Sequence, residues 1–276
     1  MFCRIRGVEM HYEEVGSGRP LFVLHGWDFN GAMALASSEP LIGNPAGWRR
    51  IYPDLPGHGR TPIPTSVRNH DDVLDMLLEF IETIAPGERF AILGWSWGGY
   101  LALGVTHHRG SRLDGVALAI PSITWGRPHV APAHRIVRRD PEFADALRPG
   151  EQWMTEDVAS QSLALLMEVR KAGFAEALPQ ESAMFRLLDQ TPFSFDPRQL
   201  PEPLHSPALI VTGRQDHIVG FEEQWAMLDR FPRATFAVLD SAGHFLIYEQ
   251  SALASALLQE WLERVEDHSD PRHRVV

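Results

Sequence analysis

Short apolar runs alternate with segments of helical periodicity along most of this 276-residue chain. The run FAILGW (90–95) meets a glycine-containing turn and leads into GGYLALGVTHHR (98–109), which has the residue spacing of a helix. The same order recurs at PALIVTG (207–213) and FEEQWAMLDRF (221–231). Strands that are apolar along their whole length are typical of a parallel sheet buried on both faces. The alternation therefore predicts an α/β fold with helices on both faces of a parallel sheet.

The other apolar and periodic segments fit the same scheme. FCRIRG and EMHYEEVG are expected to form a hairpin that turns at Gly7. HDDVLDMLLEFIETI (70–84) has helical spacing, and it begins with Asp71 and Asp72, whose charges favour a helix N-terminus. We expect further strands at 20–26, 49–57, 113–121 and 234–240, and a long helix at 248–265.

One region breaks the alternation, because it contains no strand-like apolar run. It extends from about Ser122 to Leu200, and its helical segments are expected at 140–147, 155–174 and 180–188. We predict a helical cap insertion at 122–200, within an α/β core domain formed by 1–121 and 201–276. At the carboxyl edge of the sheet, such an insertion would cover the crevice where α/β proteins bind ligands. A helical ornament without a role is the alternative.

Composition limits the class of protein. Hydrophobic residues make up 44% of the chain, which is enough for a sizeable core. The formal charge of −11 argues against a nucleic-acid partner, since no cluster of Lys and Arg could neutralise many phosphates. The single cysteine, Cys3, permits no internal disulfide. With no signal-peptide pattern and no apolar run long enough to cross a bilayer, we expect a cytoplasmic protein without membrane contact.

The turn between the 90–95 strand and the following helix carries the pattern G-x-S-x-G, from Gly94 to Gly98. A serine at so tight a turn projects its hydroxyl from the sheet edge, and the flanking glycines remove side chains that would collide there. The helix also directs its N-terminal dipole and N–H groups at this point. The pattern indicates that Ser96 is a nucleophile. A serine in an ordinary strand–helix turn is the alternative.

A nucleophilic hydroxyl needs a base, and the base needs an orienting acid. Of thirteen histidines, His244 lies in LDSAGHFLIYE, between the last strand and the last helix. Asp216 lies in VTGRQDHIVG, directly after another strand, and both loops are expected at the same sheet edge as Ser96. Asp240 is the local rival for the acid. The resulting order, Ser96, Asp216, His244, is the order expected when the serine stands at such an elbow.

An oxyanion hole is expected near the end of the 20–26 strand. Gly26 lets the chain turn so that the amide of Trp27 faces a substrate carbonyl, and the amide of Trp97 would be the second donor. The rings of these two tryptophans are expected to wall the pocket. His25 is expected to brace this loop by hydrogen bonds, with a second catalytic histidine as the alternative.

Several motifs together resemble the α/β-hydrolase fold family, in the branch with a helical cap: LHGWDFNG, YPDLPGHGRT, GWSWGGYLAL, VTGRQDHIVG and SAGHF. The resemblance covers the chain from about residue 8 to 265 and is weakest in the cap. It implies an eight-stranded, mostly parallel sheet with one antiparallel strand near the N-terminus. It implies Ser96 as nucleophile, His244 as base and Asp216 as acid, with the amides of Trp27 and Trp97 as oxyanion donors.

The resemblance also narrows the chemistry. Related epoxide hydrolases and haloalkane dehalogenases use Asp as the nucleophile, and Ser96 excludes that mechanism. A serine forms an acyl-enzyme with a carbonyl substrate, so no metal and no organic cofactor is expected. Aromatic and Met residues of the cap favour an apolar pocket, or equally a core between cap and sheet: Trp125, Trp153, Met154, Phe185 and Phe193.

The substrate class expected first is a small or medium apolar carboxylic ester. Proline iminopeptidases are similar, but they need acidic cap residues to hold an amine, and eleven acidic residues against nine basic ones at 122–200 give no special support. C–C hydrolases of aromatic breakdown and a non-hydrolytic ligand-binding protein are further alternatives. The expected partner is a small molecule, and both monomer and homodimer stay open.

Overall fold

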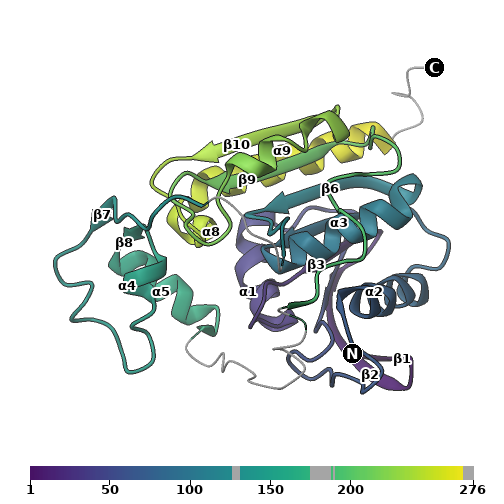
Figure 1. The fold of residues 1–276 in the computed structure, drawn as a ribbon, viewed down its shortest axis with the longest axis horizontal. Helices are drawn as coiled ribbons and strands as arrows, with labels where there is room; N and C mark the ends of the chain where they lie inside the picture. The colour runs from purple at the N-terminus through teal and green to yellow at the C-terminus, as the bar shows by residue number, and fades with distance from the viewer. Residues whose placement is uncertain (126–130, 175–187, 189, 270–276) are drawn as a thin grey trace.

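An eight-stranded sheet forms the centre of the computed structural model, which describes residues 1–125, 131–174, 188 and 190–269. Its strand order is β1-β2-β4-β3-β5-β6-β9-β10 (Figure 1). Antiparallel pairing is confined to β2, which runs against both of its neighbours, and the other pairs are parallel. The mostly parallel sheet with one antiparallel strand is therefore confirmed. The strands are β1 (Phe2–Ile5), β2 (Val8–Gly16), β3 (Arg19–Leu24), β4 (Trp48–Pro53), β5 (Phe90–Trp95), β6 (Leu113–Ala119), β9 (Ala208–Gly213) and β10 (Ala234–Leu239).

Helices cover both faces of this sheet (Figure 1). Along β5, Phe90 and Ile92 pack with α2 and α3, whereas Ala91 and Leu93 face the side of α1 and α9. This alternation follows from the two-residue period of a strand, and it makes both faces apolar. The helices are α1 (Gly31–Ile42), α2 (His70–Ile84), α3 (Trp97–Arg109) and α9 (Ser251–Ser269), with the short η1 (Gly110–Arg112), α7 (Glu222–Trp225), η3 (Leu228–Arg230) and α8 (Leu246–Glu249).

Local signals place two of the predicted elements where we expected them. The helix predicted at 70–84 is α2, and the side chain of Asn69 caps it by accepting a hydrogen bond from the N–H of Asp72 at 2.9 Å. The N-terminal hairpin turns at Gly7, whose φ of 86° suits a residue without a Cβ.

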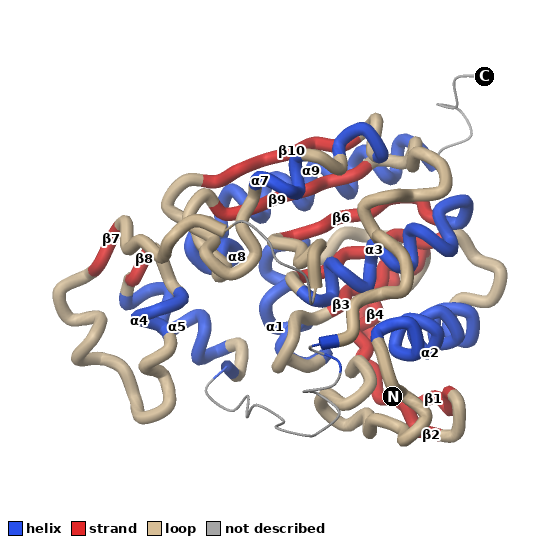
Figure 2. Tube along the Cα trace, viewed as in Figure 1, coloured by secondary structure: helices blue, strands red, loops and turns tan. Residues whose placement is uncertain are grey.

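Within the chain between the neighbouring strands β6 and β9, residues 131–174 form a separate group of short elements, drawn at the left of Figure 2, whereas Phe193 and Leu200 pack in the core beside α2 and α3. We call residues 122–200 the inserted region. It contains α4 (Met154–Asp157), α5 (Leu163–Lys171) and a two-residue parallel pair, β7 (Arg138–Arg139) with β8 (Ser160–Gln161). The expectation of a strand-free region was wrong for this pair, which is too short to give a periodic pattern.

Two of the helices expected in the inserted region differ in the structure. Residues 140–147 form turns, in which Phe143 donates to Asp140 and Leu147 to Ala144. The segment 155–174 is divided into α4 and α5 by β8, because Ser162 caps a new helix by accepting from the N–H of Leu165. The helix expected at 180–188 lies outside the described residues except for Leu188.

The C-terminal helices are also more broken than their periodicity predicts. Residues 221–231 form α7 and the 3₁₀ turn η3, and the helix expected at 248–265 begins at Ser251, after the short α8. Within the described ranges, no helix combines the length and the apolar character needed to cross a bilayer.

Candidate active site

Ser96 occupies the tight turn between β5 and α3. Its backbone angles, φ 50° and ψ −111°, are strained for a residue with a side chain. A Cβ added at Gly94 would lie 2.3 Å from the carbonyl oxygen of Gly98, and one added at Gly98 would lie 2.4 Å from that of Leu24. The glycines therefore permit this close approach. Ser96 precedes α3 but makes no side-chain cap bond, which leaves its hydroxyl for another partner.

The structure brings Ser96, His244 and Asp216 into one hydrogen-bonded row. The Nε2 atom of His244 is 3.0 Å from the Ser96 Oγ, and its Nδ1 atom is 2.9 Å from Asp216 Oδ2. Asp216 is fully buried in the loop after β9, and His244 lies in the loop after β10. Because the ionised carboxylate accepts, Nδ1–H donates to it, and Nε2 is left to accept the serine proton.

The surroundings of His244 raise the pKa of its imidazole. Burial lowers its pKa, but attraction to the Asp216 carboxylate and the hydrogen bond between them outweigh burial, so the pKa is raised overall. Asp157 and Glu249 add smaller contributions in the same direction. The second oxygen of Asp216, Oδ1, accepts the N–H groups of Ile218 and Val219 at 2.9 and 3.0 Å. These bonds fix the carboxylate that orients the imidazole.

Asp240, the rival for the acid, has other partners. Its side chain is exposed and accepts hydrogen bonds from Gln215 at 2.8 Å and from the hydroxyl of Ser241. The row of hydrogen bonds thus runs through Asp216.

The loop after β3 passes directly beside Ser96. A Cβ added at Gly26 would lie 3.6 Å from the Ser96 Cβ. Trp97 is the first residue of α3, so its N–H has no acceptor within the helix. The backbone N–H of Trp27 belongs to the same loop as Gly26. Both amides thus belong to segments that lie next to Ser96 in space, and their oxyanion role stays a prediction.

His25 is buried below this loop. Its Nδ1 donates to the carbonyl of Gly26 at 2.7 Å, and its Nε2 accepts the N–H of Leu55 at 3.0 Å. Burial and the neighbouring His58 hold its pKa well below the ordinary value, although the Gly26 carbonyl opposes them. A neutral His25 that joins the loops after β3 and β4 supports the bracing role.

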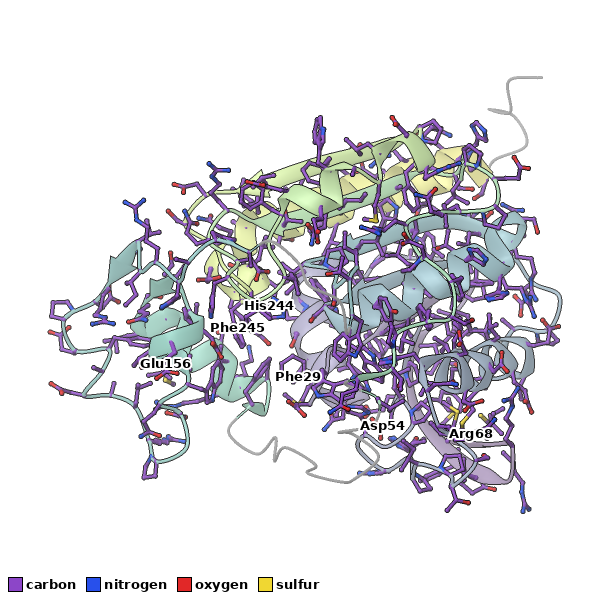
Figure 3. The ribbon with its side chains drawn as sticks, viewed as in Figure 1. Phe29, Asp54, Arg68, Glu156, His244 and Phe245 are labelled. Carbon is purple, nitrogen blue, oxygen red and sulfur yellow. The ribbon has the colours of Figure 1, made fainter. Side chains whose placement is uncertain are left out.

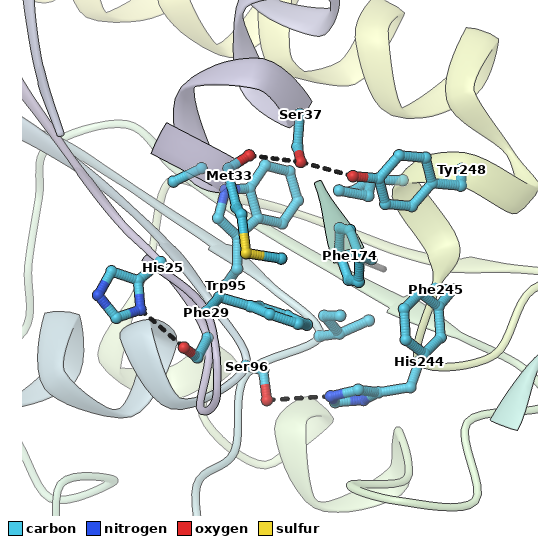
Figure 4. Close-up of a pocket in the computed structure, with 14 residues that line it drawn as sticks. His25, Phe29, Met33, Ser37, Trp95, Ser96, Phe174, His244, Phe245 and Tyr248 are labelled. Carbon is cyan, nitrogen blue, oxygen red and sulfur yellow. Dashed lines mark hydrogen bonds between the residues drawn. The ribbon is translucent and has the colours of Figure 1, made fainter. Parts of the chain in front are cut away.

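An apolar cavity opens beside Ser96 and His244. About 40 Å³ of it can hold the centre of a water-sized sphere, and the space between its lining atoms reaches about 480 Å³ when the open solvent at its mouth is included. Figure 4 shows the side chains of Phe29, Met33 and Phe174 around it. Its lining also includes Trp95, Ile120, Phe245, Ile247 and Tyr248. Figure 3 places Phe29, His244 and Phe245 between the inserted region and the sheet. No carboxylate lines the cavity among the described residues.

The cavity lining also contains two hydroxyl groups, those of Ser37 and Tyr248, that are hydrogen-bonded to each other. The hydroxyl of Ser37 donates to the carbonyl of Met33 at 2.7 Å, so it accepts the hydrogen bond from the Tyr248 hydroxyl at 2.5 Å (Figure 4). Burial and the Glu168 charge raise the pKa of Tyr248, against the bond to Ser37. The tyrosine therefore stays neutral, and the cavity presents a largely apolar wall.

The aromatic rings that we expected around the pocket mostly lie elsewhere. Trp27 and Trp97 pack edge to face at 4.9 Å within an aromatic cluster that also contains Trp125, and neither of their rings lines the cavity. Phe193 stacks on Tyr100, whereas Trp153 and Met154 form a core with Phe143. Phe185 lies outside the described residues. The expectation that the rings of Trp27 and Trp97 wall the pocket was wrong. Trp125, Trp153, Met154 and Phe193 belong to apolar cores or pack against them, the alternative that the sequence left open for these four.

Sequence reasoning missed two residues of this site. Phe174, the aromatic side chain that the inserted region contributes to the cavity, ends a helical segment and has no pattern that marks it as pocket lining. Glu249 lies in the GHFLIYE stretch after His244, and only the folded chain reveals its partners. In the part of the chain that the structure describes, no three His, Cys, Asp or Glu side chains are arranged to hold a metal ion.

Comparison with curated proteins finds relatives along nearly the whole chain. The pimeloyl-[acyl-carrier protein] methyl ester esterase of Nitrosospira multiformis is 27% identical, and the match covers 90% of this chain and 97% of the relative. The (E)-2-((N-methylformamido)methylene)succinate hydrolase of Acinetobacter baylyi is 24% identical over 92% of this chain and 94% of its own length. Both of these distant relatives are named as hydrolases.

Solved structures share the fold. An alpha/beta superfamily hydrolase from Oenococcus oeni superposes with a TM-score of 0.85 at 24% identity, and the match covers 96% of this chain and 99% of that one. The model of the alpha/beta hydrolase family matches residues 21–256, which include Ser96, Asp216 and His244. This chain therefore belongs to the alpha/beta hydrolase family.

Proposed function

We propose that this protein is a serine hydrolase that cleaves a small or medium, largely apolar carboxylic ester through an acyl-enzyme. The proposal rests on one observation: hydrogen bonds join Ser96, His244 and Asp216, and Ser96 lines an apolar cavity. The 27%-identical relative, a methyl ester esterase, supports an ester as the substrate class.

The geometry suits two successive acyl transfers. The Ser96 oxygen would attack the ester carbonyl while His244 Nε2 takes its proton, and the amides of Trp27 and Trp97 would stabilise the negative oxygen. His244 would then return the proton to the departing alcohol. In the second half, water loses its proton to His244 and attacks the acyl carbon, and the carboxylic acid leaves as Ser96 regains its hydrogen. The chemistry uses side chains and backbone alone.

The inserted region serves in this proposal as a cap over the substrate. Phe174 reaches the cavity from that region, and its ring centroid lies 4.5 Å from that of Phe29 in the loop after β3. Contacts of this kind support the division into a core domain at 1–121 and 201–276 and a cap at 122–200. An apolar group held between the two parts would be shielded from water.

Labelling with a fluorophosphonate tests the activated serine and its pH dependence together. The probe should attach to Ser96 in the parent protein, whereas His244→Ala should react at least about a hundredfold more slowly because the proton acceptor is missing. Neutral His244 is the reactive form, and the pKa of this group is raised. The labelling rate should therefore fall about tenfold per pH unit below a midpoint that lies above the ordinary value of about 6.5. Equal rates for His244→Ala, or labelling at another residue, would contradict the proposal.

Truncation of Phe174 tests the acyl pocket. Phe174→Ala removes a ring that packs against Phe29 and Tyr248, so kcat/KM for short p-nitrophenyl esters should fall by about tenfold. Longer acyl chains should lose less, because they can fill the space. Met167→Ala, an exposed change in the same inserted region, is the matched control. An equal loss for every chain length would place the acyl group elsewhere.

A comparison of substrate classes separates the other candidate activities. The absence of a carboxylate from the described cavity lining disfavours the iminopeptidase alternative, which needs a partner for the substrate amine. A panel of esters, prolyl amides and C–C substrates on purified protein compares all three. Turnover of a prolyl amide or a C–C substrate with a higher kcat/KM than any ester would replace the ester assignment.

A further inference from the structure

A partly buried carboxylate joins the inserted region to the loop that carries His244. Glu249 ends α8, and its Oε2 atom accepts the N–H of Gly243, the residue before His244, at 2.6 Å. Its Oε1 atom accepts the N–H groups of Ala159 and Ser160 at 2.7 and 2.9 Å. One side chain therefore holds two segments that are far apart in sequence.

A second contact reinforces this junction. The hydroxyl of Ser160 donates to the carbonyl of Ser241 at 2.7 Å, on the same loop as His244. The carbonyl oxygen of Asp157 also approaches this loop, since a Cβ added at Gly243 would lie 3.5 Å from it. The segment 157–160 thus fits against the loop both through its backbone and through a side chain.

Three backbone N–H groups satisfy the carboxylate of Glu249 in place of a cationic side chain. No Lys or Arg forms an ion pair with this residue within the described chain. Burial raises its pKa, while the three backbone N–H groups act in the opposite direction. Removing a carboxylate from water is costly unless hydrogen bonds satisfy it, and the partly buried Glu249 receives them from the two segments that it joins.

We propose that Glu249 is a positioning residue, through which the seating of segment 157–160 fixes the loop and the orientation of the base His244. The catalytic meaning of this coupling rests on the proposed hydrolase function, but the coupling itself does not. Release of the inserted region would free the N–H of Gly243 from its carboxylate and loosen the loop directly before the imidazole. Docking of the cap and alignment of the base would then be one event.

The charged groups around His244 determine how a change at Glu249 should shift the pKa of the His244 imidazole. Carboxylates face it from three elements, Asp216 after β9, Asp157 at the end of α4 and Glu249 in α8. The imidazole of His217 opposes them, and the ring of His134 lies 4.7 Å from that of His217. Removal of the Glu249 charge leaves the other two carboxylates in place. The pKa of His244 should then fall, because one of the charges that raise it is gone.

Glu249→Gln tests the proposal, since the new side chain has similar size, no charge and one acceptor oxygen. Glu263→Gln, an exposed change in α9, is the matched control for the loss of charge. Hydrogen exchange should become faster at 159–160 and at 243 in Glu249→Gln and stay unchanged in the control. An NMR titration should give a lower pKa for His244, and the fluorophosphonate rate should fall about tenfold, the scale of one lost charge-assisted hydrogen bond.

The readouts distinguish this proposal from the hydrolase proposal. If the parent protein is not labelled at Ser96, the hydrolase assignment fails, while exchange and the His244 titration still decide the role of Glu249. The positioning role is overturned if Glu249→Gln speeds amide hydrogen exchange only at 159–160 or only at 243, or if it leaves the pKa of His244 unchanged. If Glu249→Gln does not fold, Ser160→Ala probes the same junction by removal of its hydroxyl bond, and unchanged exchange at 241–243 overturns the proposal.

Discussion

Ser96→Ala is expected to lower kcat on p-nitrophenyl esters by a factor of about 10³ or more. The variant keeps the shape of the turn but loses the oxygen that would form the acyl-enzyme. A residual rate would come from substrate binding and the oxyanion donors, which the change leaves in place. Steady-state kinetics at a pH above the midpoint of His244 measure the loss.

A second buried serine supplies the control for this change. The hydroxyl of Ser206 donates to the carbonyl of Leu113, the first residue of β6. This bond lies at the amino ends of the parallel strands, far from the proposed site at their carboxyl ends. Ser206→Ala should therefore keep the parent kcat, with a loss of stability of about 1 kcal/mol from one hydrogen bond. Full activity of a folded Ser96→Ala protein would refute the serine mechanism.

The core of the fold could be predicted because its signals are local. Strand β5 is an apolar run that ends at a glycine turn, and α2 has both a helical period and a capping Asn69. In the inserted region, the helical period did not agree with the capping and pairing that the structure shows. The pattern at 155–174 favoured one helix, but pairing of Ser160 and Gln161 with another short segment divides it. Periodicity does not report a two-residue pairing with a distant partner.

The same difference separates the predicted from the unpredicted parts of the site. Ser96 stands in a motif whose geometry follows from its own glycines, and His244 and Asp216 each follow a strand. Glu249 accepts hydrogen bonds from Ala159 and Ser160, which lie 90 and 89 residues away, and no local pattern marks it. Phe174 lies at the cavity through ring contacts with Phe29, Phe245 and Tyr248, all distant in sequence. Positions set by tertiary packing are therefore those that sequence reasoning missed.

Asp216→Asn is expected to lower kcat by about 10³–10⁴, through the tautomer of His244. Oδ1 of Asp216 accepts two backbone N–H groups, so the oxygen of an asparagine must stay there and its NH₂ must face His244. Nδ1 then has to accept a hydrogen bond, which places the imidazole proton on Nε2. That atom can no longer take the proton of Ser96.

The rival carboxylate gives the matched control for this prediction. Asp240→Asn makes the same chemical change at an exposed residue, and its effect on kcat should stay within about threefold, as for most surface substitutions. The imidazole nitrogens in Asp216→Asn can be observed directly by ¹⁵N NMR, which should find the proton on Nε2 instead of Nδ1. A normal tautomer with a large loss of kcat would mean that Asp216 acts mainly by holding its loop. A larger loss in Asp240→Asn would move the acid to Asp240, and the hydrogen bond seen between Asp216 and His244 would then have no part in proton transfer.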